Sequence, residues 1–80
     1  MGNDIDYNDV SFILGLKVKP GKENNVRSAV KDTPNILKSF KALGQFDVIL
    51  LIGNEEDAPG LMKKMGEIEN VLNVFFIDLE

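Results

Sequence analysis

The sequence predicts a single α+β domain in which a four-stranded antiparallel sheet carries two helices on one face. Three observations lead to this prediction. The chain has 80 residues, which is the size of one domain. Its apolar residues alternate with polar ones in some segments, as in half-buried strands, and recur at helical spacing in others. Glycine and proline residues separate these segments.

The first strand is predicted over residues 10–19. Its larger apolar residues stand at every second position, as expected when one face of a strand is buried. They are Val10, Phe12, Leu14, Leu16 and Val18. Ile13 points to the other face, and Pro20 followed by Gly21 ends the strand.

A helix is predicted next, over residues 22–33. Most of this stretch is polar, but Val26, Ala29 and Val30 recur at the spacing that forms one apolar stripe on a helix. Pro34 sets the end of the helix, because the residue before a proline avoids the helical region of backbone conformation.

A second strand over residues 36–43 and a third over residues 46–52 are predicted to form a hairpin. Gly44 lies in the short loop between them, where a glycine readily adopts a positive φ. The third strand is apolar at nearly every position. The side chains predicted to face the helices are Phe46, Val48, Leu50 and Ile52. Ile49 and Leu51 then point to the opposite face.

The last two elements are a helix after Gly53 and a strand over residues 71–79. Asp57 is predicted to cap the helix, with Pro59 in the first turn, where its missing N–H does no harm. The apolar stripe of this helix consists of Leu61, Met62, Met65 and Ile68. The complete order is βαββαβ, a ferredoxin-like fold whose usual form has both helices on one face of the sheet.

Two short helices cover only one face of such a sheet, so the other face is predicted to be apolar and open. An open apolar face marks an interface, and we expect two copies of the chain to pair sheet to sheet in a dimeric α/β barrel. In the last strand, Phe75 and Ile77 are placed on the opposite face from the interface. The predicted interface residues are Ile13, Ile49, Leu51, Val74 and Phe76. The alternative is a monomer with an unusually apolar surface.

The composition excludes several classes of function. The chain has no cysteine and no histidine, which removes disulfides, zinc and haem sites, and thiol chemistry. Without histidine, a hydrolytic triad of the usual type is absent. Nine basic residues are spread among thirteen acidic ones, and the net charge of −4 disfavours nucleic-acid binding by the chain itself. No apolar run approaches the ~20 residues of a membrane span.

Residues 1–9 are predicted to be a polar leader, and residues 10–80 to be the folded domain. The leader is too acidic for a signal peptide, so a cytoplasmic protein is expected. Its acidic residues resemble the start of a calcium-binding loop. However, Asp9 and Gly15 occupy the two positions where that loop needs Gly and Glu.

A second acidic group consists of Glu55, Glu56 and Asp57. Its oxygens could bind Mg²⁺ or Ca²⁺. Acidic residues also gather at helix N-termini, because the helix dipole favours them there. The helix-terminus explanation is preferred, and the sequence predicts no metal, no cofactor and no catalytic residue.

The hairpin loop at residues 43–47 is the remaining candidate for a binding site. Gly44 lets backbone amides approach a ligand, and Asp47 opens an otherwise apolar strand. The Asp47 carboxylate can pair with a ligand's ammonium group, or it can cap backbone amides of the hairpin. The residues alone leave these two roles equally open.

Three segments together resemble the effector-binding domain of the Lrp/AsnC (feast/famine) transcription regulators. They are VKPGKENNV, TPNILKSFKALGQFDVILLI and IENVLNVFFIDL. The residues that match the family pattern are Pro20, Gly21, Lys22, Pro34, Gly44, Phe46 and Asp47. The resemblance covers residues 12–79, and the order and spacing of the motifs make it fairly specific.

The resemblance implies dimers that pair through their sheets and often assemble further. It also implies that an amino acid or related metabolite binds between dimers near the hairpin, with Asp47 holding the amino group. The ligand-binding residues expected on this basis are Leu43, Gly44, Gln45, Phe46, Asp47, Val74 and Phe76. Two departures stand out: a helix-turn-helix domain is missing before residue 10, and the last strand is apolar where the family often offers hydroxyl groups.

The leading hypothesis is therefore a non-enzymatic module for effector binding and oligomerisation, resembling the stand-alone form of the family domain. It is expected to form a homodimer or larger homo-oligomer and to co-assemble with full-length regulators. One alternative is a scaffold that binds no ligand. Another is a small dimeric α/β-barrel enzyme, which is disfavoured because the chain has no His or Trp and Tyr7 lies in the leader.

Overall fold

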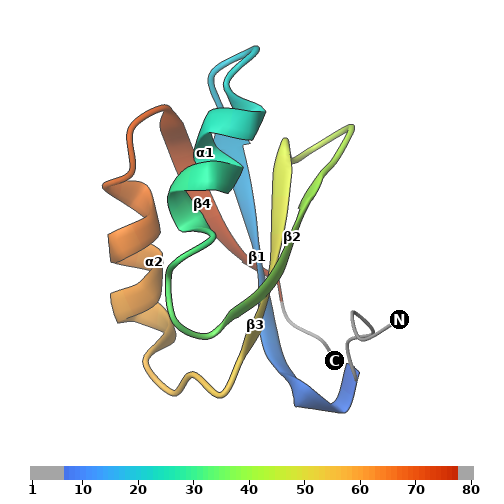
Figure 1. Ribbon diagram of the computed structural model, residues 1–80, viewed down its shortest axis with the longest axis vertical. Helices are drawn as coiled ribbons and strands as arrows, with labels where there is room; N and C mark the ends of the chain where they lie inside the picture. Colours follow the sequence, from blue (N-terminus) through green and yellow to red (C-terminus); the bar gives the residue numbers. More distant parts are fainter. Residues whose placement is uncertain (1–6, 78–80) are drawn as a thin grey trace.

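The elements follow the predicted order in the computed structural model, which describes residues 7–77 (Figure 1). They are a short 3-10 helix Tyr7–Asp9, β1 Val10–Val18, α1 Glu23–Val30, β2 Ile36–Lys41, β3 Val48–Gly53, α2 Ala58–Gly66 and β4 Val71–Ile77. The fold is ferredoxin-like, as predicted. Most of the predicted leader, and the predicted end of the last strand at residue 79, lie outside the described residues.

The four strands form one antiparallel sheet in the order β2-β3-β1-β4. The two central strands, β1 and β3, are therefore neighbours, and β2 and β4 are the edges. Both helices lie on the same side of this sheet (Figure 1). The other side is left without a covering element among the described residues.

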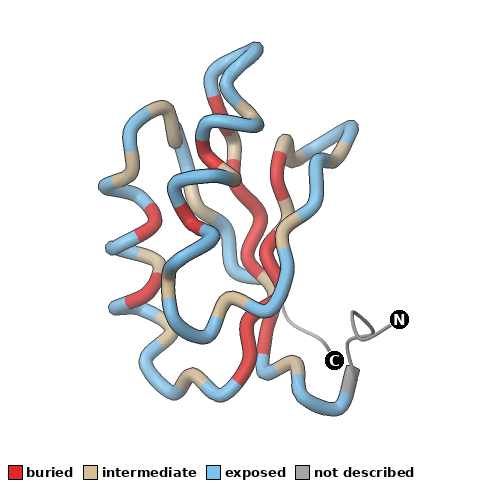
Figure 2. The backbone as a smooth tube through the Cα atoms, viewed as in Figure 1, coloured by how far each residue is buried: buried red, intermediate tan, exposed pale blue. Residues whose placement is uncertain are grey.

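The core lies between the helices and the sheet. Figure 2 shows that buried residues concentrate in the two central strands and on the inner sides of the helices. The strand residues of this core are Phe12, Leu14, Leu16, Val18, Val48, Leu50 and Ile52, and the helices add Val26, Val30, Leu61 and Met65. Each fully buried side chain of this kind contributes about 1.5–3 kcal/mol. The predicted alternation of β1 is confirmed from Phe12 to Val18.

The start of α2 follows the predicted capping pattern. The Asp57 carboxylate accepts a hydrogen bond from the Gly60 backbone N–H at 2.9 Å, and Pro59 occupies the first turn. Such a cap contributes about 1 kcal/mol. The first helix is shorter than predicted, because it ends at Val30, and Ala29 is exposed rather than part of the buried stripe.

The prediction that Phe46 faces the helices is wrong. Regular strand structure in β3 begins at Val48, so the alternation of the strand does not extend back to Phe46. The Phe46 ring instead covers Gly15 on the uncovered side of the sheet, where a Cβ atom on Gly15 would lie 2.7 Å from the ring. A glycine in β1 is therefore what allows the ring to lie against the strand.

The predicted orientation of β4 is also wrong, by one residue. Phe76 pairs with Leu14 and Val74 pairs with Leu16. Directly paired residues point to the same side of a sheet, so Phe76 and Val74 lie on the helix side. Because β4 is apolar at almost every position, its sequence leaves the register open, and a shift of one residue exchanges the two faces.

Candidate functional site

The side of the sheet without helices is an apolar surface, here called the open sheet face. Strand pairing places Phe75 beside Gly15, Ile77 beside Ile13, and Phe40 beside Ile49 on this side. Its apolar residues are Ile13, Leu37, Phe40, Phe46, Ile49, Leu51, Phe75 and Ile77. Three of the predicted interface residues, Ile13, Ile49 and Leu51, therefore lie together, whereas Val74 and Phe76 do not join them.

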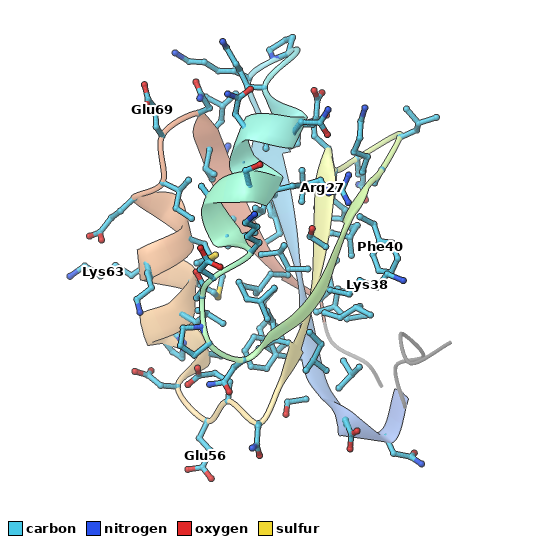
Figure 3. The ribbon with its side chains drawn as sticks, in the orientation of Figure 1. Arg27, Lys38, Phe40, Glu56, Lys63 and Glu69 are labelled. Atoms are coloured by element: carbon cyan, nitrogen blue, oxygen red, sulfur yellow. The ribbon has the colours of Figure 1, made fainter. Side chains whose placement is uncertain are left out.

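Several side chains of the open sheet face remain partly in solvent. Leu37, Phe40 and Phe75 are 40%, 37% and 42% exposed, whereas Leu51 at the centre is only 6% exposed. Lys38 lies beside them, with its Nζ 5.2 Å from the centre of the Phe40 ring (Figure 3). The face thus combines partly exposed aromatic rings, a residue type enriched at protein interfaces, with a charged group at its margin.

The hairpin at residues 42–47 adjoins one end of this face. Phe46 connects the two, because its ring centre lies 5.4 Å from that of Phe75. Gly44 adopts a φ of 109°, a conformation that other residues rarely take, and Leu43 at the tip is fully exposed. The loop is therefore open to solvent at its tip and anchored at its base.

Asp47 anchors the base of the hairpin. Its backbone N–H donates to the Leu16 carbonyl at 2.9 Å, and its Oδ2 accepts from the backbone N–H of Val18 at 2.8 Å. The Ala42 N–H donates to the Asp47 carbonyl at 2.9 Å. Lys17 lies nearby, with Nζ 3.9 Å from Oδ2. The side chain thus extends the pairing of β1 beyond the start of β3 and caps a strand amide.

The predicted ligand-binding residues do not all meet. Residues 43–47 form one loop, but Val74 packs against the core on the helix side and Phe76 stacks on Phe12 at 5.3 Å. Phe75 is the β4 residue that reaches the hairpin. The sequence signal for this contact is a glycine in a central strand, Gly15, which leaves space for two aromatic rings from neighbouring elements.

The acidic group at residues 55–57 forms local hydrogen bonds. Glu55 accepts from the Asp57 N–H at 3.0 Å and from the Asn35 side-chain amide at 3.1 Å. Asp57 in turn caps α2. Among the described residues, no group of three or more His, Cys, Asp or Glu side chains is arranged to hold a metal ion. Two of the residues behind the calcium-loop interpretation, Asp4 and Asp6, lie outside the described part of the chain.

These hydrogen bonds lower the pKa of Glu55 below its ordinary value of 4.5, chiefly through the Asp57 N–H and then through the Asn35 amide. A lowered pKa means that the folded state favours the ionised carboxylate. The resulting stabilisation is present above pH 4.5 and is lost as the pH falls through the pKa of the folded state.

We therefore expect the Asn35→Gly variant to have a higher Glu55 pKa than the unmodified chain, although still below 4.5, because the Asp57 N–H remains. Glycine suits this position, since Asn35 has a φ of 74°. Carbon-13 NMR titration of the Glu55 carboxyl group measures both values. Equal pKa values in the two proteins would contradict the role of Asn35.

One curated protein is similar to the chain over most of its length. The HTH-type transcriptional regulator FL11 of Pyrococcus furiosus is 33% identical over 69 residues, which cover 84% of this chain and 45% of FL11. The chain is related to the Lrp/AsnC-type regulators. This Lrp/AsnC-related chain spans about half the length of the curated relative it matches. No protein-family model matches it.

Two solved structures are similar to the chain over most of its length. The structure of PH0061 is 25% identical, with a TM-score of 0.67, over 96% of this chain and 56% of that one. The structure of TTHA0845 from Thermus thermophilus has a TM-score of 0.76 at 10% identity, covering 85% and 89% of the two chains, and therefore supports the fold alone. No helix in residues 7–77 is long and apolar enough to cross a membrane.

Proposed function

We propose that this Lrp/AsnC-related chain is a non-enzymatic module for oligomerisation and effector binding. Two copies pair through the open sheet face, and the hairpin at residues 42–47 contributes to a site for an amino acid or related metabolite. The observation that carries this proposal is the open sheet face itself. It adjoins the hairpin, and no described element covers it.

Pairing would bury apolar surface that a single small chain leaves in water. A chain of 80 residues buries only about 60–65% of its unfolded surface, so its own core gives little stability. A second sheet packed on the open sheet face would remove Phe40 and Phe75 from water, and burying aromatic rings contributes strongly at interfaces. Lys38, which lies at the margin of the open sheet face, would remain in solvent at the edge of the interface.

The relationship to a transcription regulator and the geometry of the hairpin support effector binding. Asp47 uses Oδ2 to accept from Val18. Oδ1 on the same carboxylate is the atom to which a ligand ammonium group would bind. Lys17 at 3.9 Å would have to move away, because two cations at one carboxylate repel. Co-assembly with full-length regulators would bring the module to DNA.

A ligand-free scaffold is the second candidate. It is favoured by the engagement of Asp47 with a strand amide, which gives the carboxylate a structural reason to be present. The apolar character of Val74 and Phe76 favours it too, because neither side chain offers a hydrogen-bonding group to a ligand. Both the effector-binding module and the scaffold would oligomerise through the open sheet face, so only a test of ligand binding distinguishes them.

A thermal-shift screen against the twenty amino acids tests effector binding, with Asp47→Asn as the matched variant. Asparagine keeps an oxygen to accept from the Val18 N–H but removes the charge. A ligand at ~100 times its dissociation constant adds about 2.7 kcal/mol, or several degrees for a domain of this size. We expect a selective shift that Asp47→Asn loses. The absence of a shift with every amino acid would favour the scaffold.

A further inference from the structure

A polar groove lies between α1 and the edge strand β2, on the side of the sheet that carries the helices. It is open to solvent along its length and has a volume of about 300 Å³. The residues that line it are Asn24, Arg27, Ser28, Lys31 and Ser39. The four that belong to α1 and its end follow the spacing of one helix face, and Ser39 faces them from β2. Its volume is at the lower limit of small-molecule sites.

The charge of this groove is opposite to that of the chain. The whole chain has a net charge of −4, but the lining contains two cations, Arg27 and Lys31, and no carboxylate. These two cations are four residues apart on one helix face, a spacing at which like charges repel. An anion bound between them would relieve this repulsion.

Arg27 is held in place at the wall of the groove. Its Nε donates to the Ser39 Oγ at 3.2 Å, and its Nη2 donates to the Ser39 carbonyl at 3.4 Å. Figure 3 shows the side chain between α1 and the sheet. A guanidinium group has five N–H donors in a fixed plane, so most remain for a ligand. The Ser39 hydroxyl, which accepts from Arg27, also keeps its own hydrogen to donate.

We infer that this groove binds the phosphate group of a small phosphorylated metabolite. Its donors are a fixed guanidinium, an ammonium group, two hydroxyls and an amide, and this set suits a dianion with several oxygens better than a single carboxylate. The groove and the open sheet face are on opposite sides of the sheet. The site therefore stays accessible in the proposed dimer and does not depend on amino-acid binding.

Nitrogen-15 NMR provides a direct test, because Arg27 is the only arginine of the chain and its Nε–H signal is unique. The full chain is titrated with inorganic phosphate, and with chloride at matched ionic strength. We expect a saturable shift of the Arg27 signal with phosphate alone. A parallel titration with glycerol phosphate distinguishes a phosphorylated metabolite from free phosphate as the ligand. Tighter binding of the ester than of phosphate would indicate a metabolite site. Equal or weaker binding of the ester would indicate a site for free phosphate.

Two substitutions of the same kind complete the test. Lys31→Gln removes a cation of the groove and is expected to weaken phosphate binding about fivefold. Lys63→Gln removes an exposed cation from α2, away from the groove, and is expected to leave binding unchanged (Figure 3). Two results would overturn the inference: a shift of the Arg27 signal that chloride reproduces, or an equal loss of phosphate affinity in both variants. Either result would mean that phosphate responds only to the overall charge of the protein.

Discussion

Replacing Phe75 by aspartate is expected to convert the proposed dimer into a monomer. Phe75 is 42% exposed on the open sheet face and contacts Phe46 there. In a sheet-to-sheet dimer its ring would be fully buried, and a carboxylate in that position would lose its hydration without gaining a partner. The loss of one buried aromatic anchor alone costs about 2 kcal/mol or more. Sedimentation equilibrium measures the change as an increase in dissociation constant of roughly 30-fold or more.

Phe76→Asp is the matched control. Phe76 is the next residue of the same strand and is 48% exposed, but it lies on the helix side and stacks on Phe12. Its substitution is expected to reduce the thermal stability of the fold while the protein remains dimeric. If Phe76→Asp gave monomers and Phe75→Asp gave dimers, the helix side of β4 would be the interface, and our assignment of the open sheet face would fail.

The second large effect is expected for Asp47→Ala. This substitution removes the oxygen that accepts from the Val18 N–H, and Val18 is only 4% exposed. A buried N–H without a partner costs about 1–3 kcal/mol. The melting temperature should therefore fall by roughly 5–20 °C for a domain of this size. Differential scanning calorimetry without ligand provides the measurement.

Asp47→Asn separates this structural role from ligand binding. The amide oxygen can still accept from Val18, so most of the stability should return, although the contribution of charge is lost. An Asp47→Ala variant as stable as the unmodified chain would show that the hydrogen bond to Val18 contributes little. The structural role of the Asp47 carboxylate would then be excluded, and ligand binding would be the better explanation for an aspartate at this position.

The order of the elements could be predicted from the sequence because each one has a local signal. Pro34 limits the first helix, and Asp57 with Pro59 defines the start of the second. The alternation in β1 identifies which of its faces is buried. These signals act over a few residues and do not depend on which strand lies next to which.

The faces of β4 and the position of Phe46 could not be predicted in this way. Strand β4 is apolar on both sides, so only its pairing with β1 decides that Phe75 lies on the open sheet face. Phe46 precedes the regular part of β3, where alternation does not apply, and its place is decided by the space that Gly15 leaves. Both are tertiary effects.

The candidate sites show the same limit. The open sheet face was expected, because two short helices cannot cover both sides of a sheet. The groove at Arg27 was not expected from the sequence, since its lining combines a polar helix face with Ser39, a residue from a different element. The sequence contains the polar spacing of the helix face, but only the contact between α1 and β2 brings Ser39 to the guanidinium group.

Sedimentation equilibrium of the unmodified chain shows whether two copies pair at all. The chain has a mass of 8.9 kDa. Pairing through the open sheet face predicts a mass of at least twice this value at micromolar concentration, with an association that weakens in Phe75→Asp and not in Phe76→Asp. A mass of 8.9 kDa at every concentration up to several hundred micromolar would contradict pairing, because the open sheet face would then remain in solvent.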